Sequence, residues 1–312
     1  MRSLLFSLVA ALIVGCATPK ALVPAAGGLS NLQPVLLPDF DGDRAIKRSS
    51  TREAYDAARA DERFQMRQFT YVSDGLTVGA YLYDARVHGK GRSPVIVFNR
   101  GGFTRPDGFV GEILVMAHRY AEAGFIVVAP QLRGSNGWEG RDELGGADLH
   151  DLMNIVPELA RMGIVDKSRV YLAGESRGGA MVYMALRAGF PARAAAVWGA
   201  FTDVDALIVP GGPQAKFAPM IWPDIEQHRA EIVESRSALR WPEKIGAPVL
   251  IMHGGADGDI PLEQSQKMDA ALTKLGMPHD FKVFDGEPHT IGGRSDERDA
   301  AAIAWFRKYG AN

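Results

Sequence analysis

Short apolar segments alternate with longer segments of helical periodicity through most of the chain. Strands are predicted at residues 69–73, 76–84, 94–99, 124–130, 169–174, 194–200, 248–254 and 281–286, and helices at 108–123, 147–162, 177–189, 262–275 and 295–309. The central apolar segments are uninterrupted, which is typical of parallel strands buried on both faces. The pattern predicts an α/β fold with an eight-stranded, mostly parallel sheet and helices on both faces, its first two strands joined as a hairpin at Asp74-Gly75.

Two regions depart from this alternation and divide the chain. Residues 16–68 contain several Pro and Gly residues, and we expect a tether followed by a lead-in with a short surface helix at 49–64. Residues 69–312 are expected to form one domain. Within it, residues 203–245 interrupt the alternation of strands and helices with Pro, Gly and Trp. We expect these residues to form a lid over the carboxyl ends of the strands.

The first fifteen residues have the pattern of a secretory signal peptide. Arg2 precedes an apolar run from Leu4 to Val14, which is shorter than the about 20 residues that span a bilayer. The single cysteine, Cys16, follows Ile-Val-Gly, and this ending resembles a bacterial lipobox. The resemblance implies that Cys16 is lipidated and becomes the mature N-terminus, and Ala17 after it suggests the periplasmic side of the outer membrane. The alternative is an ordinary signal peptide with an incidental cysteine.

Composition narrows the classes of partner. The chain has 312 residues, 46% of them hydrophobic and 23% charged, as in ordinary globular proteins. A formal net charge of −2 gives no basic surface, so no nucleic-acid partner is expected. The seven histidines show no metal-ligand spacing, and no phosphate-loop or dinucleotide fingerprint is present, so no metal and no cofactor are expected. The oligomeric state is left open.

Ser176 is the first candidate for chemistry. It lies in the GxSxG pattern of residues 174–178, after a buried strand and before a helix. This pattern is typical of a nucleophile elbow, in which small residues let the strand and the helix approach each other and the helix N-terminus favours developing negative charge. The alternative is that Ser176 only caps a helix after a glycine turn.

A serine nucleophile needs a base and a carboxylate that orients the base. In α/β-hydrolases these follow the serine in the order acid, then histidine. Asp257 and Asp259 follow the seventh predicted strand, and His289 follows the eighth, so all the candidates lie at carboxyl ends of strands. The alternative is a simple turn at the two aspartates and a surface histidine.

The oxyanion hole is expected near the start of the helix and in the loop after the third predicted strand. Arg177 would supply one backbone N–H. Arg100 and Gly101 lie where the second donor must come from, and the guanidinium of Arg100 would also be able to hydrogen-bond an oxyanion.

Several segments together resemble the prolyl oligopeptidase family of serine peptidases. They are VVAPQLRGSNGWEG, the helix and elbow segment ending in GESRGG, the segment PVLIMHGGADGDIP, and FDGEPHT. The resemblance covers roughly residues 69–310. It implies an α/β-hydrolase catalytic domain with Ser176 as nucleophile, His289 as base and Asp257, rather than Asp259, as the acid, because the family's acid stands four residues before the position of Pro261.

The chain also departs from that family's pattern. Arg100 stands where many members have Tyr or His, and Arg177 stands where Tyr is frequent. Fewer than 70 residues precede the first predicted strand, so the N-terminal β-propeller of the family is not expected. We therefore expect a lipid-anchored serine hydrolase of the cell envelope that cleaves peptide bonds, with a carboxylesterase of short acyl esters as the alternative and a non-catalytic binding protein as a third possibility.

Overall fold

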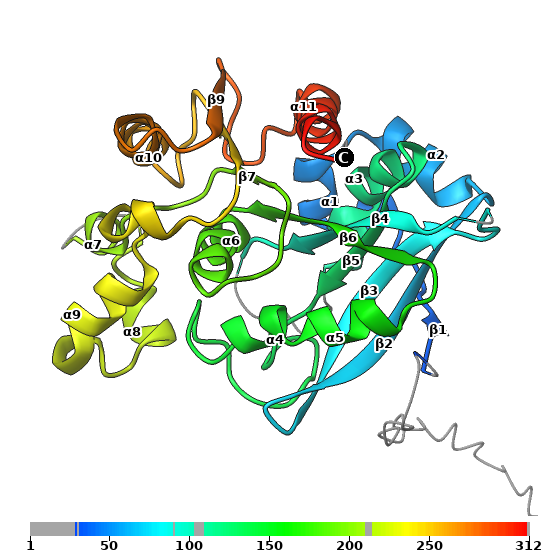
Figure 1. The fold of residues 1–312 in the computed structure, drawn as a ribbon, viewed down its shortest axis with the longest axis horizontal. Helices are drawn as coiled ribbons and strands as arrows, with labels where there is room; N and C mark the ends of the chain where they lie inside the picture. The colour runs from blue at the N-terminus through cyan, green and yellow to red at the C-terminus, as the bar shows by residue number, and fades with distance from the viewer. Residues whose placement is uncertain (1–28, 30, 90, 103–108, 210–213, 311–312) are drawn as a thin grey trace, which may run out of the picture.

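A sheet of nine strands runs through the protein, seen here in a computed structural model (Figure 1). The structure describes residue 29 and residues 31–89, 91–102, 109–209 and 214–310. The predicted signal peptide, 1–15, and Cys16 lie outside these residues. Within them, none of the helices has the length and apolar character needed to cross a membrane.

The strands follow the order β1-β2-β3-β5-β4-β6-β7-β8-β9 across the sheet. Pairing is antiparallel from β1 to β5 and parallel from β5 to β9, so the expected fold class is confirmed. The strands are β1 Gln33–Pro34, β2 Phe64–Ser73, β3 Leu76–Ala85, β4 Ser93–Asn99, β5 Ile126–Pro130, β6 Val165–Glu175, β7 Ala195–Trp198, β8 Val249–Gly254 and β9 His279–Phe284. The ninth strand, β1, was not predicted because two residues carry no periodic signal.

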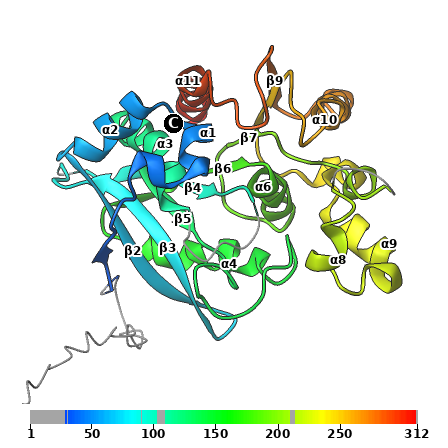
Figure 2. The same cartoon turned by 180° about the vertical axis from the view of Figure 1, so that it is seen from behind.

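Helices cover both faces of the sheet and create two apolar cores (Figure 1, Figure 2). On one face lie α4 (Leu149–Met153), α5 (Ile155–Arg161), α6 (Arg177–Arg187) and α10 (Glu263–Lys274). On the other face lie α1 (Arg44–Ser49), α2 (Arg52–Ala60), α3 (Val110–Glu122) and α11 (Ser295–Lys308). This double layer explains why the central parallel strands β5, β7 and β8 are nearly continuous apolar segments, since neither face meets water.

The segment before β2 is packed against the domain over most of its described length. Ile46 of α1 and Tyr55 of α2 are fully buried. Tyr55 donates its hydroxyl to the carbonyl of Pro38 at 2.8 Å, and Ile46 lies against Gly111 of α3, where an added Cβ would be 2.5 Å from its Cδ1. The helix predicted at 49–64 thus corresponds to α2, but it and α1 before it extend the core instead of lying only on the surface.

Short helices replace regular alternation between β7 and β8. They are α7 (Val204–Leu207), α8 (Ala218–Ile221), α9 (Ile225–Arg236) and the 3-10 turns η2 (Ala238–Arg240) and η3 (Pro242–Lys244), while residues 210–213 lie outside the described part. Trp222 joins this region to the loop after β5 by donating its indole N–H to the carbonyl of Glu143 at 2.9 Å. Motion of this segment as a lid stays a prediction.

Candidate active site

Ser176 stands at the apex of a tight turn from β6 into α6. Its backbone has φ 54° and ψ −121°, a conformation that residues other than glycine rarely adopt. The turn depends on two glycines: a Cβ on Gly174 would lie 2.5 Å from the carbonyl oxygen of Gly178, and one on Gly178 would lie 2.0 Å from that of Asn99. The backbone N–H of Ser176 donates to the carbonyl of Trp198 at 2.8 Å, which ties the turn to β7.

His289 and Asp257 come together from the loops after β9 and β8. The Nδ1 atom of His289 lies 2.7 Å from Oδ2 of Asp257. The other oxygen, Oδ1, accepts the backbone N–H groups of Asp259 and Ile260, each at 2.9 Å, so the carboxylate is fixed within its own turn. Of the two aspartates that the sequence offers, Asp257 is therefore the one whose carboxylate contacts His289.

A second histidine also holds this carboxylate. His253, at the end of β8, is fully buried, and its Nε2 lies 3.1 Å from Oδ2 of Asp257. Its Nδ1 lies 2.7 Å from the hydroxyl of Ser265. Sequence reasoning treated His253 only as a packed structural residue and missed this contact; its spacing of four residues from Asp257 is the signal that was present.

The surroundings shift the pKa of both groups in the pair. Burial raises the pKa of the Asp257 carboxyl, but hydrogen bonds from His253 and His289 outweigh burial and hold it well below its usual range. Burial lowers the pKa of His289, but the hydrogen bond to Asp257 and the charges of Asp257 and Glu175 outweigh it, so the pKa is raised above 6.5. Asp257 thus stays ionised and stabilises a charged imidazole.

The guanidinium of Arg100 stabilises the loop after β4 through hydrogen bonds. It donates to the carbonyls of Gly101 at 3.1 Å and Gln131 at 3.2 Å and to the hydroxyl of Ser135 at 2.5 Å. Burial, together with the charge of Arg177, lowers the pKa of Arg100 to about 9. These contacts give the Arg100 side chain a supporting role in the loop, and a direct hydrogen bond from its guanidinium to an oxyanion stays a prediction.

Arg177 is likewise fixed by its side chain and offers its backbone to the site. The buried guanidinium forms ion pairs with Asp142 and with Asp148, the latter at 2.6 Å. The backbone of Gly101 approaches Ser176 closely, since a Cβ on Gly101 would lie 3.3 Å from Cβ of Ser176. The two segments predicted to supply the oxyanion hole, at Arg177 and at Arg100-Gly101, therefore both lie beside Ser176.

Ser176, His289, Arg100, Gly101 and Arg177 all line one cavity of about 920 Å³. One wall is apolar and comes from the region after β7, with Phe201, Val204, Leu207, Ile208, Phe217, Ala218, Ile221 and Trp222. Another wall is polar and comes from α1 and the residues after it, with Lys47, Arg48, Ser49, Ser50 and Thr51. The cavity therefore offers different surfaces to different parts of a substrate.

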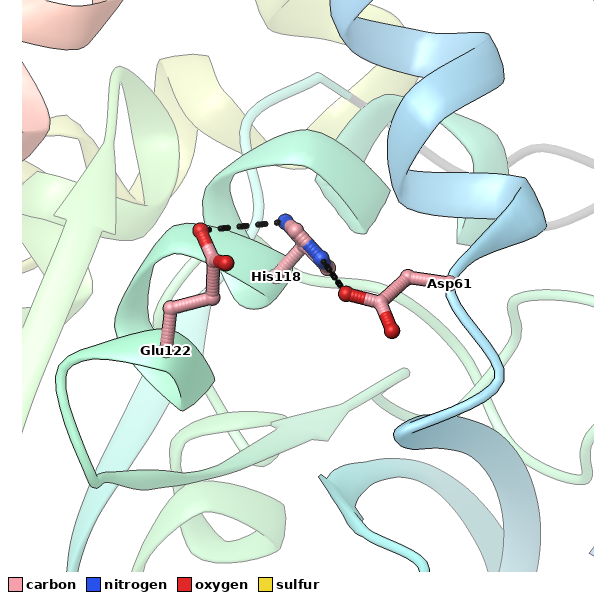
Figure 3. Close-up of side chains that lie close together, drawn as sticks. All are labelled: Asp61, His118 and Glu122. Carbon is pink, nitrogen blue, oxygen red and sulfur yellow. Dashed lines mark hydrogen bonds and ion pairs between the residues drawn. The ribbon is translucent and has the colours of Figure 1, made fainter.

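A cluster of possible metal ligands lies elsewhere, between the start of β2 and the end of α3. Figure 3 shows Asp61, His118 and Glu122, whose ligand atoms lie within 4.8 Å of one another. His118 Nε2 is 2.9 Å from Oδ2 of Asp61, but Arg63 also donates to Asp61 at 2.6 Å and to Glu122 at 2.7 Å. Because this cation neutralises both carboxylates, we describe the group as an ion-pair cluster. The absence of a metal site stays a prediction.

A match to a protein-family model shows which family this chain belongs to. The model described as the prolyl oligopeptidase family matches residues 112–312. The chain belongs to the prolyl oligopeptidase family. The resemblance predicted from the sequence segments is confirmed, and so is the class of enzyme, a serine-type peptidase.

Family relatives differ widely in how much of their length this chain covers. The protein named "Uncharacterized peptidase YtmA" of Bacillus subtilis (strain 168) is 28% identical over 241 residues, which are 76% of this chain and 91% of that protein. The acylamino-acid-releasing enzyme of Homo sapiens is 25% identical over 240 residues, but these are only 32% of that protein. This chain thus spans about a third of the length of the larger relative.

Solved structures of peptidases also resemble this chain over most of its length. A puromycin-hydrolyzing peptidase of Mycobacterium tuberculosis superposes with a TM-score of 0.66 at 25% identity, covering 78% of this chain and 39% of that one. An acylaminoacyl peptidase of Pyrococcus horikoshii superposes with a TM-score of 0.67 at 23% identity, covering 81% and 42%. The second likeness shows the fold alone, which is the α/β-hydrolase fold with a mostly parallel sheet.

Proposed function

We propose that Ser176, His289 and Asp257 are the catalytic residues of this peptidase. His289 takes the proton from the Ser176 hydroxyl as the serine oxygen attacks the carbonyl carbon of the scissile bond, and Asp257 stabilises the resulting imidazolium. His289 then gives this proton to the leaving amine, which departs and leaves an acyl-enzyme. Water, deprotonated by the same imidazole, attacks the acyl-enzyme and frees Ser176.

The tetrahedral intermediate carries a negative charge on the former carbonyl oxygen. We assign its stabilisation to the backbone N–H groups of Arg177 and Gly101, which flank Ser176. The side chains of Arg177 and Arg100 support these donors: one is anchored to Asp142 and Asp148, and the other is bonded to the loop itself. Each such donor contributes roughly 10²–10³ in turnover.

The observation that carries this proposal is a single cavity reached by all the reacting groups. Ser176 at its strained turn and His289, held by Asp257, line the same space of about 920 Å³. That space fits small amide substrates better than folded proteins. Among similar proteins, one is named for the release of acylamino acids and another for the hydrolysis of puromycin, and we propose short peptides as substrates for this chain.

A carboxylesterase is the second candidate. The apolar wall formed by the region after β7 has room for an acyl chain, and the same nucleophile and base cleave esters and amides. The two activities differ in the leaving group, because an amine must be protonated as it departs while an alkoxide or phenoxide leaves more easily.

A matched pair of substrates separates the two candidates. The probes are the 4-nitroanilide and the 4-nitrophenyl ester of the same N-acyl phenylalanine, assayed with residues 17–312 and with Ser176→Ala. A peptidase hydrolyses the anilide with a kcat/KM far above that of Ser176→Ala. Hydrolysis of the ester alone would make the protein an esterase, and hydrolysis of both at equal rates in the two proteins would refute Ser176 as nucleophile.

We further propose that Cys16 is lipidated and anchors the protein to the cell envelope, on the periplasmic side of the outer membrane. The support is the position of the single cysteine after the apolar run that ends at Val14. Several acyl chains would give firm anchoring, because each buried CH₂ contributes about 0.8 kcal/mol. The full chain expressed in bacteria should fractionate with membranes and carry acyl mass on Cys16, and Cys16→Ser should abolish both; unmodified Cys16 would contradict the proposal.

A further inference from the structure

Helix α1 forms the edge of the cavity next to His289. The hydroxyl of Thr290, the residue after His289, donates to the carbonyl of Arg48 at 3.0 Å. Gly292 is equally close, because a Cβ there would lie 2.1 Å from the same carbonyl oxygen. The C-terminal turn of α1 is thus fixed directly against the loop that carries the proposed base.

Arg48 differs from the other cations that line the cavity. Lys47 pairs with Asp41 at 3.2 Å, and Arg100 and Arg177 are bonded as described above. Arg298 binds Asp299 at 2.8 Å and the carbonyl of Thr290 at 2.7 Å. Within the described part of the chain, the Arg48 side chain has no such hydrogen bond or ion pair, although the residue lines the cavity and is exposed.

The chemistry of the reaction says which part of the substrate reaches this edge. The leaving amine receives its proton from His289, so it must lie within hydrogen-bond distance of that imidazole. The acyl side of the substrate then occupies the remaining space, whose wall is apolar. A short leaving group extends from His289 toward α1, and when the substrate is a peptide this group ends in a carboxylate.

Three anions line the cavity, Glu112, Glu175 and Asp259, and in the described residues none of them forms a hydrogen bond or ion pair with Arg48. Glu112 lies in the first turn of α3, where its charge acts on Arg100. Glu175 accepts the indole N–H of Trp198 at 2.9 Å, beside the serine. Asp259 lies toward the region after β7, since Gln214 donates to its carbonyl at 3.5 Å. The polar edge at α1 therefore combines one unpaired guanidinium with the hydroxyl-bearing residues Ser49, Ser50 and Thr51.

We propose that Arg48 binds the free α-carboxylate of the leaving group, so that the enzyme favours peptides from which it releases a C-terminal amino acid or a very short C-terminal fragment. This inference rests on the proposed function and adds a specificity-determining residue to it. Arginine suits this task because its planar donors match a carboxylate in a bidentate arrangement.

The test compares two peptides that share the same scissile bond. They are benzyloxycarbonyl-Phe-Ala with a free carboxylate and the same compound with a C-terminal amide, and release of alanine or alanine amide is followed by chromatography. A charge-assisted contact predicts a kcat/KM for the acid that is roughly tenfold to 10²-fold above that for the amide, and a preference that shrinks at high salt.

Variants of α1 assign the preference to one side chain. Arg48→Gln should bring the acid-to-amide ratio close to one, and Arg48→Lys, which keeps the charge, should retain part of it. Arg44→Gln is the matched control, because Arg44 lies exposed on the same helix but does not line the cavity, and its ratio should equal that of the unmodified protein.

The outcomes distinguish failure of this inference from failure of the proposed function. Equal kcat/KM for acid and amide in the unmodified protein, or a ratio that Arg48→Gln leaves unchanged, would overturn the role of Arg48 while the anilide assay still supports a peptidase. If neither the peptides nor the anilide are hydrolysed, the proposed function fails and this inference fails with it.

Discussion

Three carboxylates raise the pKa of the His289 imidazole: Asp257, Glu175 and Asp259. Asp257 is buried and bonded to it, while Glu175 acts through its charge from the strand end beside Ser176. All three favour the protonated imidazole, and only the neutral form can take the proton of Ser176. Catalysis should therefore increase with pH through a pKa above 6.5, because the group must lose its proton to act as a base.

Glu175→Gln should move the acidic limb of the kcat/KM profile to lower pH. The substitution removes a charge that raises the pKa of His289 but keeps an oxygen to accept the Trp198 indole N–H. The profile of a neutral anilide substrate between pH 5 and 9 measures the change. Asp285→Asn, on the exposed part of the loop after β9, is the control that should leave the limb in place; a shift to higher pH in Glu175→Gln would contradict this electrostatic account.

At the scale of elements, the contact between α1 and the loop after β9 is the feature that local sequence does not specify. Gly292→Ala should disturb it, because the new Cβ would lie 2.1 Å from the Arg48 carbonyl oxygen, a backbone atom that cannot turn aside. Displacement of α1 and of the His289 loop should lower kcat/KM by about tenfold to 10²-fold.

The control for this change is Gly163→Ala, where an added Cβ meets nothing within 4 Å. Circular dichroism and thermal unfolding of both variants would separate a local effect from loss of the fold. Full activity of Gly292→Ala would show that α1 does not set the position of the His289 loop.

Elements buried on both faces could be predicted from the sequence, and those made by long-range packing could not. The apolar segments at 94–99 and 248–254 correspond to β4 and β8 within one residue. The helix predicted at 147–162 is divided into α4 and α5 at Asn154. The six residues of α1 are too few to show a period and form a helix where Ile46 packs against α3.

In the active site, too, some residues could be predicted from the sequence, while the contacts made by long-range packing could not. Chain order and strand ends were sufficient to nominate Ser176, His289 and the pair Asp257 and Asp259, because parallel strands bring their carboxyl ends to one edge of the sheet. The choice of Asp257 came from the family resemblance. The supporting partners of Arg100 and Arg177 come from distant loops. Their side-chain roles followed only once those loops were placed in space.

At the scale of the whole molecule, the N-terminal segment belongs to the folded domain. It contacts α3 through the apolar packing of Ile46 and through the ion-pair cluster of Asp61, Arg63, His118 and Glu122, of which Figure 3 draws Asp61, His118 and Glu122. It also supplies one wall of the cavity. Its loss should therefore weaken both the fold and the active site.

Ile46→Ala should lower the free energy of unfolding by about 2–5 kcal/mol, because a fully buried side chain leaves a cavity that its surroundings cannot fill. Urea denaturation of residues 17–312 measures this change. Leu36→Ala is the control in the same segment: Leu36 is 92% exposed, and its removal should change stability by less than about 0.5 kcal/mol. Equal, small effects of both changes would show that the segment is not part of the cooperative fold.

The central claim is that Ser176 is the activated nucleophile of a serine peptidase, and covalent labelling tests it most directly. The folded protein is treated with a fluorophosphonate, and the modified residue is located by mass spectrometry of its proteolytic fragments. We predict one adduct per chain, on Ser176. A folded protein that takes no label, or takes it on another residue, would contradict the claim.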